Sequence, residues 1–325
     1  MLTDCTLLLI RSGQTYDISQ LLVGSVQWSG RKGASARTMT ATLLESGKYP
    51  RSGIDAVQGN HLIFLYKGAE LFRGLIFSDA PSDKETMSIK AFDNGVYLSN
   101  NRDTFCYKSK TLTQIFRDIC TRFEIPYSAA ESGYKIPSLK KSAATAWDVL
   151  QEAMSATFTA TGRRYWIYSE KDRLELILRR ETTIPWVLEP GVNLISYNLS
   201  TSIEKTRTRL KMVWNTSDID TTILLEKRPE LESRIGIMQE IESVSKGTPR
   251  AQYLALGKQK IAELAKPVIT LSVEAIGIAD IISGRCVHAI LPNIAGRTYY
   301  VDEDAHTFDG THRMRLKLTR TEDEI

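Results

Sequence analysis

The residues best suited to bind a metal ion are four histidines, two of which are close in the sequence. His306 and His312 flank a short turn sequence, and Asp302 and Asp304 lie just upstream. A zinc site needs at least three protein ligands at a recognised spacing, and no third ligand of that kind follows this pair. We therefore expect His306 and His312 to be cross-strand neighbours on the surface of a hairpin, and we predict no metal site. The remaining histidines are His61 and His288.

Cysteine chemistry finds no support in the sequence. The four cysteines are scattered, without a CxxC pair or metal-type spacing. A cysteine nucleophile needs a base such as histidine beside it, and the sequence indicates no such partner. We expect free thiols packed as small apolar groups in a reducing cytoplasm. The cysteines are Cys5, Cys106, Cys120 and Cys286.

Acidic residues could serve a glycosidase, which holds two carboxyl groups across a sugar-binding cleft. Glu181, Glu189 and Glu204 are candidates, but nothing in the sequence places two of them opposite each other. We interpret them as solvated surface acids. The sequence therefore predicts no catalytic residue, no cofactor and no enzymatic activity.

A basic, glycine-containing stretch, Ser29–Ser35, superficially resembles a phosphate-binding loop. The GxxxxGK[ST] spacing is absent, and the stretch joins two expected strands instead of opening a helix. We interpret it as a mobile basic loop. Arg31 and Lys32 are our candidates for contacts with another subunit or with a tubular partner.

The composition is that of an ordinary soluble globular protein. Of the 325 residues, 42% are hydrophobic and 25% charged, and the formal net charge of +4 is spread along the chain. Such a balance gives no electrostatic reason to expect specific nucleic-acid binding or a membrane surface. The first residues lack a signal-peptide pattern, and no window reaches the ~20 apolar residues that span a bilayer. We expect synthesis and folding in a cytoplasm.

The elements that position these residues are mostly strands. Residues 38–43, 61–66, 71–77 and 87–92 are short apolar or alternating runs between turn residues, which is typical of a sandwich or barrel. The middle of the chain differs. Thr111 and Gln114 form a capping-box pattern before an apolar helical stripe, a second helix is expected from about Ser142, and residues 164–178 indicate a hairpin around Glu170–Asp172.

The last third returns to strands. Thr248 and Pro249 suit the start of one helix, and a terminal hairpin is expected between residues 298–301 and 314–318 around Asp309-Gly310. We predict an α+β, mostly β fold with three parts: residues 1–98, an α/β domain at 99–191, and residues 192–325 with an insertion at about 215–266.

An internal repeat is the most informative pattern. The run Val26–Ser29, followed by a polar loop and Arg37–Ala41, resembles Tyr197–Ser200 followed by Arg207–Lys211. Farther on, a glycine opens an apolar run in each half, and an alternating strand begins at Met87 in the first half and at Met314 in the second. We interpret 1–98 and 192–325 as two copies of one β-barrel module.

The chain also resembles a known family, the baseplate hub proteins of phage tails and of the defective prophage PBSX (the XkdQ and YqbQ type). The resemblance covers nearly the whole chain and consists of diffuse hydrophobic and glycine patterns. The stretches that carry it are Gly59–Phe64, Glu70–Ile76, Ile89–Asn94, Thr111–Ile125, Gly236–Glu240, Tyr299–Val301, His306–Phe308 and Met314–Leu318.

This resemblance implies a specific role. Such hubs are similar to the trimeric hub of T-even phages, whose subunits carry two tail-tube-like barrels and form a pseudo-sixfold ring. The implied partners are two further copies of the chain, the tail tube protein, the central spike and other baseplate proteins, with passage of DNA through the channel. The chain would belong to a virion or a phage-tail-like bacteriocin, assembled in the host cytoplasm. A tail-associated cell-wall hydrolase and a carbohydrate- or peptide-binding β-protein are the alternatives.

Overall fold

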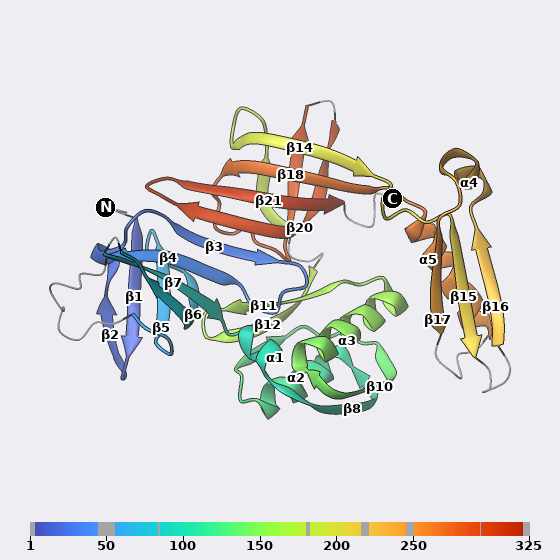
Figure 1. Cartoon of the computed structure of the whole chain (residues 1–325), viewed down its shortest axis with the longest axis horizontal. Helices are drawn as coiled ribbons and strands as arrows, with labels where there is room; N and C mark the ends of the chain where they lie inside the picture. The colour runs from blue at the N-terminus through green and yellow to red at the C-terminus, as the bar shows by residue number, and fades with distance from the viewer. Residues whose placement is uncertain are drawn as a thin grey trace. The chain divides into compact units, whose positions relative to one another are not determined.

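The computed structural model describes residues 4–44, 56–83, 85–179, 183–215, 221–244, 250–292 and 294–320. Strands dominate it, which confirms the predicted α+β, mostly β class. The chain divides into two compact units, residues 1–197 with 272–325, and residues 198–271. Within the first unit, segments from the two ends of the chain lie side by side, with β3 beside β20 in Figure 1.

The first part of the chain is an antiparallel sheet with a single buried face. Alternation produces this face: in the strand at 38–44, Met39, Ala41 and Leu43 are buried while the residues between them are less so. All four strands expected here are present. The strands are β1 (Cys5–Arg11), β2 (Gln14–Asp17), β3 (Val26–Arg31), β4 (Thr38–Leu44), β5 (His61–Tyr66), β6 (Ala69–Pro81) and β7 (Thr86–Asp93).

The middle of the chain is the predicted mixture of helices and strands. Thr111 caps α2 and forms the capping box with Gln114. The second helix begins at Ala146 instead of Ser142, because β10 stays paired with β8 as far as Thr145. The elements are α1 (Val96–Asn100), β8 (Arg102–Thr111), α2 (Leu112–Arg122), β9 (Tyr127–Ala129), β10 (Lys135–Thr145), α3 (Ala146–Thr161), β11 (Tyr165–Glu170) and β12 (Arg173–Leu178).

The last part of the first unit is again a sheet, with the terminal hairpin where the sequence predicts it. Its strands are β13 (Thr183–Leu188), β14 (Leu194–Ser202), β18 (Val268–Ile276), β19 (Cys286–Leu291), β20 (Ile294–Phe308) and β21 (His312–Arg320). The chain leaves this sheet after β14 and returns to it along β18.

The two predicted modules do not close into barrels among the described residues. Their strands form one continuous sheet in the order β14-β18-β21-β20-β3-β4-β7-β6-β5-β1-β2, with β19 and β13 attached to β20. The order β14-β18-β21-β20-β19 nevertheless repeats β3-β4-β7-β6-β5. The repetition ends there, because β1 is antiparallel to β5 whereas β13 is parallel to β19.

The repetition extends to individual hydrogen bonds. The hairpins β5–β6 and β19–β20 have the same register at an offset of 225 residues, and both carry a bulge after Phe64 or its counterpart Ala289. The amide of Gly59 donates to Ile76 O at 2.9 Å, and that of Gly284 donates to Val301 O at 3.0 Å. Two copies of one strand arrangement are therefore present.

One of the two sequence matches behind the repeat was wrong in part. Val26–Ser29 and Tyr197–Ser200 do lie on corresponding strands, β3 and β14. Residues 207–211, however, do not correspond to β4: they lead into β15 (Arg209–Asn215), which pairs with β16 (Thr221–Lys227) and β17 (Gln239–Val244) in a separate sheet. The counterpart of β4 is β18, because the second copy is interrupted at this point.

The second unit is a small sheet covered by a helix. Its core contains Leu210 and Met212 of β15 with Tyr253 and Ile261 of α5 (Arg250–Leu264), and the Tyr253 hydroxyl donates to Met212 O at 2.8 Å. A short helix, α4 (Pro229–Ile235), follows β16. The predicted insertion, 215–266, falls in this unit, and its predicted cap, Thr248 with Pro249, lies outside the described residues. The predicted boundaries at 98/99 and 191/192 remain predictions.

Candidate assembly site

The connection from β3 to β4, residues 32–37, contacts every part of the first unit. It carries Lys32, and Arg31 is the last residue of β3, paired with Glu303 of β20. The Lys32 amide donates to Asp302 O at 2.6 Å, and its ammonium lies 3.9 Å from the Asp302 carboxylate with the side chain half exposed. Hydrogen bonds thus hold the loop that we expected to be mobile. The role of Arg31 and Lys32 in assembly stays a prediction.

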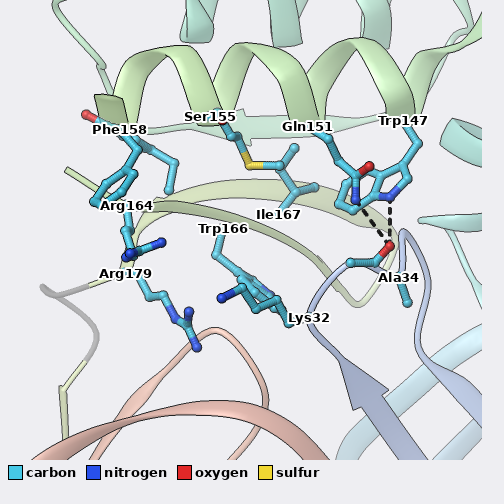
Figure 2. Close-up of a pocket in the computed structure, with 13 residues that line it drawn as sticks. Lys32, Ala34, Trp147, Gln151, Ser155, Phe158, Arg164, Trp166, Ile167 and Arg179 are labelled. Atoms are coloured by element: carbon cyan, nitrogen blue, oxygen red, sulfur yellow. Dashed lines mark hydrogen bonds between the residues drawn. The ribbon is translucent and has the colours of Figure 1, made fainter. Parts of the chain in front are cut away.

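Helix α3 reaches the same loop from the middle of the chain. The Trp147 indole N–H and the Gln151 amide both donate to Gly33 O, at 3.0 and 3.3 Å. Figure 2 shows the two side chains directed at the loop, at one end of a pocket of about 280 Å³ that Phe158, Arg164 and Arg179 line at the other end. The loop therefore connects the first copy to the α/β part.

A buried ion pair connects the loop to the second copy. Arg37 donates through both terminal nitrogens to the Asp304 carboxylate, and its Nη1 also lies 3.2 Å from Ser283 Oγ. Both side chains are almost completely buried. Burial opposes ionisation of Asp304, but the Arg37 guanidinium outweighs it and holds the pKa of the carboxyl below its ordinary value. The guanidinium also stacks on Trp28, 4.2 Å from the ring centroid.

A second buried carboxylate fixes the end of the loop. Asp93 accepts hydrogen bonds from the backbone amides of Arg37 and Gly95. Burial raises the pKa of Asp93 to about 6, and these two amides only partly offset it. Gly95 is required here, because a Cβ at that position would lie 1.9 Å from Ser35 O.

The two histidines are cross-strand neighbours, as predicted, but they are buried and do not lie on the surface. His306 Nδ1 lies 2.9 Å from His312 Nε2, and His306 Nε2 lies 3.0 Å from Ile281 O. Burial lowers the pKa of His306 to about 4 and that of His312 to about 3. Both rings are therefore neutral near pH 7 and serve packing between β20 and β21.

A second arginine connects the α/β part to the second copy. Arg179, just after β12, donates to Val301 O and to the Asp302 carboxylate. Its guanidinium lies 4.9 Å from the Trp166 ring centroid and 4.3 Å from that of Tyr300. Such stacking suits the planar guanidinium and not a lysine ammonium.

Among the residues that the structure describes, none of the metal-binding, nucleophilic or glycosidase sites considered from the sequence has a supporting geometry. Across the described ranges, no group of three or more His, Cys, Asp or Glu residues could hold a metal ion. Glu189 O accepts three amide hydrogen bonds in a turn, Glu204 lies in the second unit, and Glu181 is outside the described residues. Burial raises the pKa of Cys5 to about 11 and of Cys120 to about 12, as expected of inert thiols. None of the described helices is long and apolar enough to cross a bilayer.

Strand order and junction geometry define a duplicated-sheet protein, and comparison with known structures places this fold among phage tail proteins. A 43 kDa tail protein of prophage MuSo2 from Shewanella oneidensis has a TM-score of 0.71 at 15% identity, with 97% of this chain and 98% of that chain covered. The E. coli c3393 protein, a type VI secretion component described as similar to the T4 tail proteins gp27 and gp5, has a TM-score of 0.56 at 10% identity over 97% of this chain and 77% of that one.

The sequence relationship is closer. The chain belongs to the YQBQ-like family, whose model matches residues 26–319. The phage-like element PBSX protein XkdQ of Bacillus subtilis (strain 168) is 33% identical over 305 residues, which cover 92% of this chain and 93% of the relative. The predicted resemblance is thereby confirmed.

Proposed function

We propose that the chain is a structural baseplate hub subunit of a contractile phage tail or a phage-tail-like bacteriocin. Three copies form a pseudo-sixfold ring, with the tail tube protein on one side and the central spike on the other. The observation that carries the proposal is the duplicated strand order, since two similar modules in each of three chains present six similar units. The PBSX relative and the tail-protein fold support the same role.

The duplication explains why such a chain suits a symmetry mismatch. A closed ring of identical chains has the rotational order of its chain number. A threefold ring whose subunits each contain two similar modules can meet sixfold contacts on one face and keep threefold contacts on the other. In this proposal each module completes the tube-like barrel architecture only within the ring.

The proposal assigns no reaction to the chain, and its place is the virion or tail-like particle after assembly in the host cytoplasm. Nothing in the geometry of the described residues favours the hydrolase alternative. Zymography on peptidoglycan tests it directly, and clearing by the purified chain would contradict the structural role.

Image averaging of tail particles, or of rings of the purified chain, tests the proposed function. We expect threefold symmetry with six lobes around a channel, adjoining the tube. An assembly of this chain without threefold symmetry, or its absence from the baseplate, would overturn the proposal.

A further inference from the structure

The pairing of β3 with β20 joins the two copies within the chain, and we call it the internal junction. The first half of β20 pairs with β19, and its second half pairs on the same side with β3, from Glu303 opposite Arg31 to Phe308 opposite Val26. The second copy thus offers half of a strand as a docking edge, and the first copy occupies that edge with β3.

The corresponding edge of the first copy is the second half of β6, and no described strand pairs with it. The first half of β6 pairs with β5, whereas Phe77–Pro81 has β7 on one side and, among the described residues, no strand on the other. The counterpart of β3 in the second copy is β14, which lies at the end of the strand order. Among the described residues, one chain therefore has an unpaired acceptor edge, Phe77–Pro81 of β6, and a donor strand, β14, that is paired on one side only.

We propose that β14 of one subunit pairs with residues Phe77–Pro81 of β6 in a second copy of this chain, reproducing the β3–β20 junction between subunits. This inference rests on the proposed ring and identifies the contact that closes it. Junctions within and between chains then alternate around six modules.

Exposure supports the pairing on the acceptor side. Ile282, which precedes Gly284, is only 5% exposed because it packs in the core of the first copy. Val57 holds the same position before Gly59 and is 36% exposed. Ile282 is covered at the junction inside the chain. Val57 lies at the equivalent edge of the first copy, where no described strand pairs, and it is exposed to solvent.

Exposure on the donor strand follows the same rule. In β3, Val26 is fully buried and Trp28 is 4% exposed. In β14, every residue from Ile195 to Thr201 is exposed, including Ile195 at 55% and Tyr197 at 39%. Alternating apolar residues on an edge strand are a template for pairing with another chain, and here the duplication specifies which chain.

The backbone groups on the two edges are able to form the ladder. Asn193 O accepts from the Ile276 amide of β18, so by alternation the backbone groups of Ser196 face the open edge of β14, whereas the Leu194 amide is already bonded to Glu189 O. Ser82 N donates to Thr86 O on the β7 side of β6, so Asp79 and Pro81 face the open edge. Pro81 has no amide hydrogen, and we expect the ladder to end there.

A buried carboxylate oxygen marks the same edge. The offset of 225 residues makes Asp79 the counterpart of Asp304, whose carboxylate is satisfied by Arg37 from across the internal junction. Oδ1 of Asp79 is buried and has no hydrogen-bond partner among the described residues. A buried acceptor of this kind is costly unless a donor arrives, and a neighbouring subunit is placed to bring one.

Interchain disulfide formation in assembled particles tests the pairing. The full-length chain carries Cys106→Ser, which removes the exposed native thiol, with Ser78→Cys on β6 and, one at a time, Ile195→Cys, Ser196→Cys or Tyr197→Cys on β14. After oxidation we expect covalent dimers and trimers of this chain on a denaturing gel, strongest for one of the three positions. Thr15→Cys on β2, the strand at the opposite end of the sheet order, replaces the β14 cysteine as the matched control and should give no ladder.

The outcomes separate this inference from the proposed function. If image averaging of the same particles finds the threefold ring but none of the three variants cross-links above the control, the edges do not meet and the inference fails alone. Cross-links to a different protein would likewise overturn it and assign the edge to that partner. Particles without a threefold ring of this chain would remove the proposed function as well.

Discussion

At the scale of residues, the first unit is held together by charged groups that are buried and paired across long stretches of sequence. Arg37 and Asp304 are 267 positions apart and join the two copies. An ion pair of this kind contributes little over an apolar replacement of both partners, but it is strongly destabilising to break. Its two hydrogen bonds join Arg37, at the end of the β3–β4 connection, to Asp304 of β20.

Asp304→Asn should therefore destabilise the protein strongly. The variant leaves the Arg37 guanidinium buried without its counter-charge, at a cost of about 3–5 kcal/mol. Chemical unfolding followed by tryptophan fluorescence measures the change. Glu152→Gln is the matched control, because it removes an exposed ion pair, between Glu152 of α3 and Lys141 of β10. It should leave the unfolding midpoint almost unchanged. Equal midpoints for the two variants would show that the buried pair does not hold the copies together.

The buried histidines predict loss of stability in acid. Their pKa values in the folded protein, about 4 for His306 and about 3 for His312, lie below the ordinary 6.5 because burial disfavours the charged rings. As pH falls below 6.5 the unfolded chain takes up protons that the folded chain does not, so stability falls. Asp93 acts in the opposite direction, since its raised pKa of about 6 lets the folded protein bind a proton first.

His312→Phe tests the histidine contribution. The ring centroid lies 4.2 Å from that of Phe308, so phenylalanine keeps an aromatic ring in this stack and removes one titrating group, together with the hydrogen bond to His306. Thermal midpoints measured between pH 7 and pH 4 should decline less steeply for the variant than for the unaltered chain. An identical slope for both proteins would mean that His312 titrates alike in the folded and unfolded states.

At the scale of elements, the two copies reuse one hairpin but surround it differently. Gly59 and Gly284 occupy the same place before β5 and β19, with φ of +86° and +95°. Positive φ favours glycine in both. A Cβ at Gly59 would meet nothing within 4 Å, whereas one at Gly284 would lie 2.2 Å from the Trp166 ring.

The glycine pair predicts unequal effects of one substitution. Gly59→Ala should cost roughly 1–3 kcal/mol, the strain of holding a non-glycine residue at positive φ. Gly284→Ala should cost clearly more, because Trp166 must also move away from Arg179. Unfolding midpoints of the two variants, compared side by side, measure the difference. Equal losses would indicate that the Trp166 contact yields freely.

At the scale of the whole molecule, the second copy differs from the first by an insertion at one connection. Residues 32–37 join β3 to β4, whereas the second unit stands between β14 and β18. The Ile276 amide donates to Asn193 O, so the end of β18 lies beside the start of β14. The opposite ends of these strands, at Ser202 and Val268, are therefore close enough for a short loop.

Replacing residues 203–267 with a short Gly/Ser loop should leave the first unit folded. The core residues of the second unit belong to its own sheet and helix, and the core clusters of the first unit contain no residue of 203–267. We expect a soluble protein with cooperative unfolding and a near-ultraviolet circular dichroism spectrum that retains tertiary signal. Aggregation of the shortened chain, with no such signal, would mean that the insertion is needed for the sheet to form.

Local signals were sufficient for much of this fold. The capping box of α2 joins residues three positions apart, and the alternation in β4 and β7 needs only neighbouring residues, so the sequence determined these elements by itself. It also determined the duplication, since the glycine and the alternating strand recur at nearly the same spacing.

Tertiary structure alone decided where the second copy is interrupted, which groups are buried, and that the strands form an open sheet. Arg207-Thr208 resembles Arg37-Thr38, and this local match suggested that residues 207–211 correspond to β4. Strand pairing depends on partners far along the chain, however, and the counterpart of β4 is β18. His306 and His312 have surface-like polarity, but their burial follows from the packing of both copies against each other. The free energy of strand pairing comes from contacts between segments that are far apart in the sequence. A short sequence pattern therefore does not predict which strands will pair.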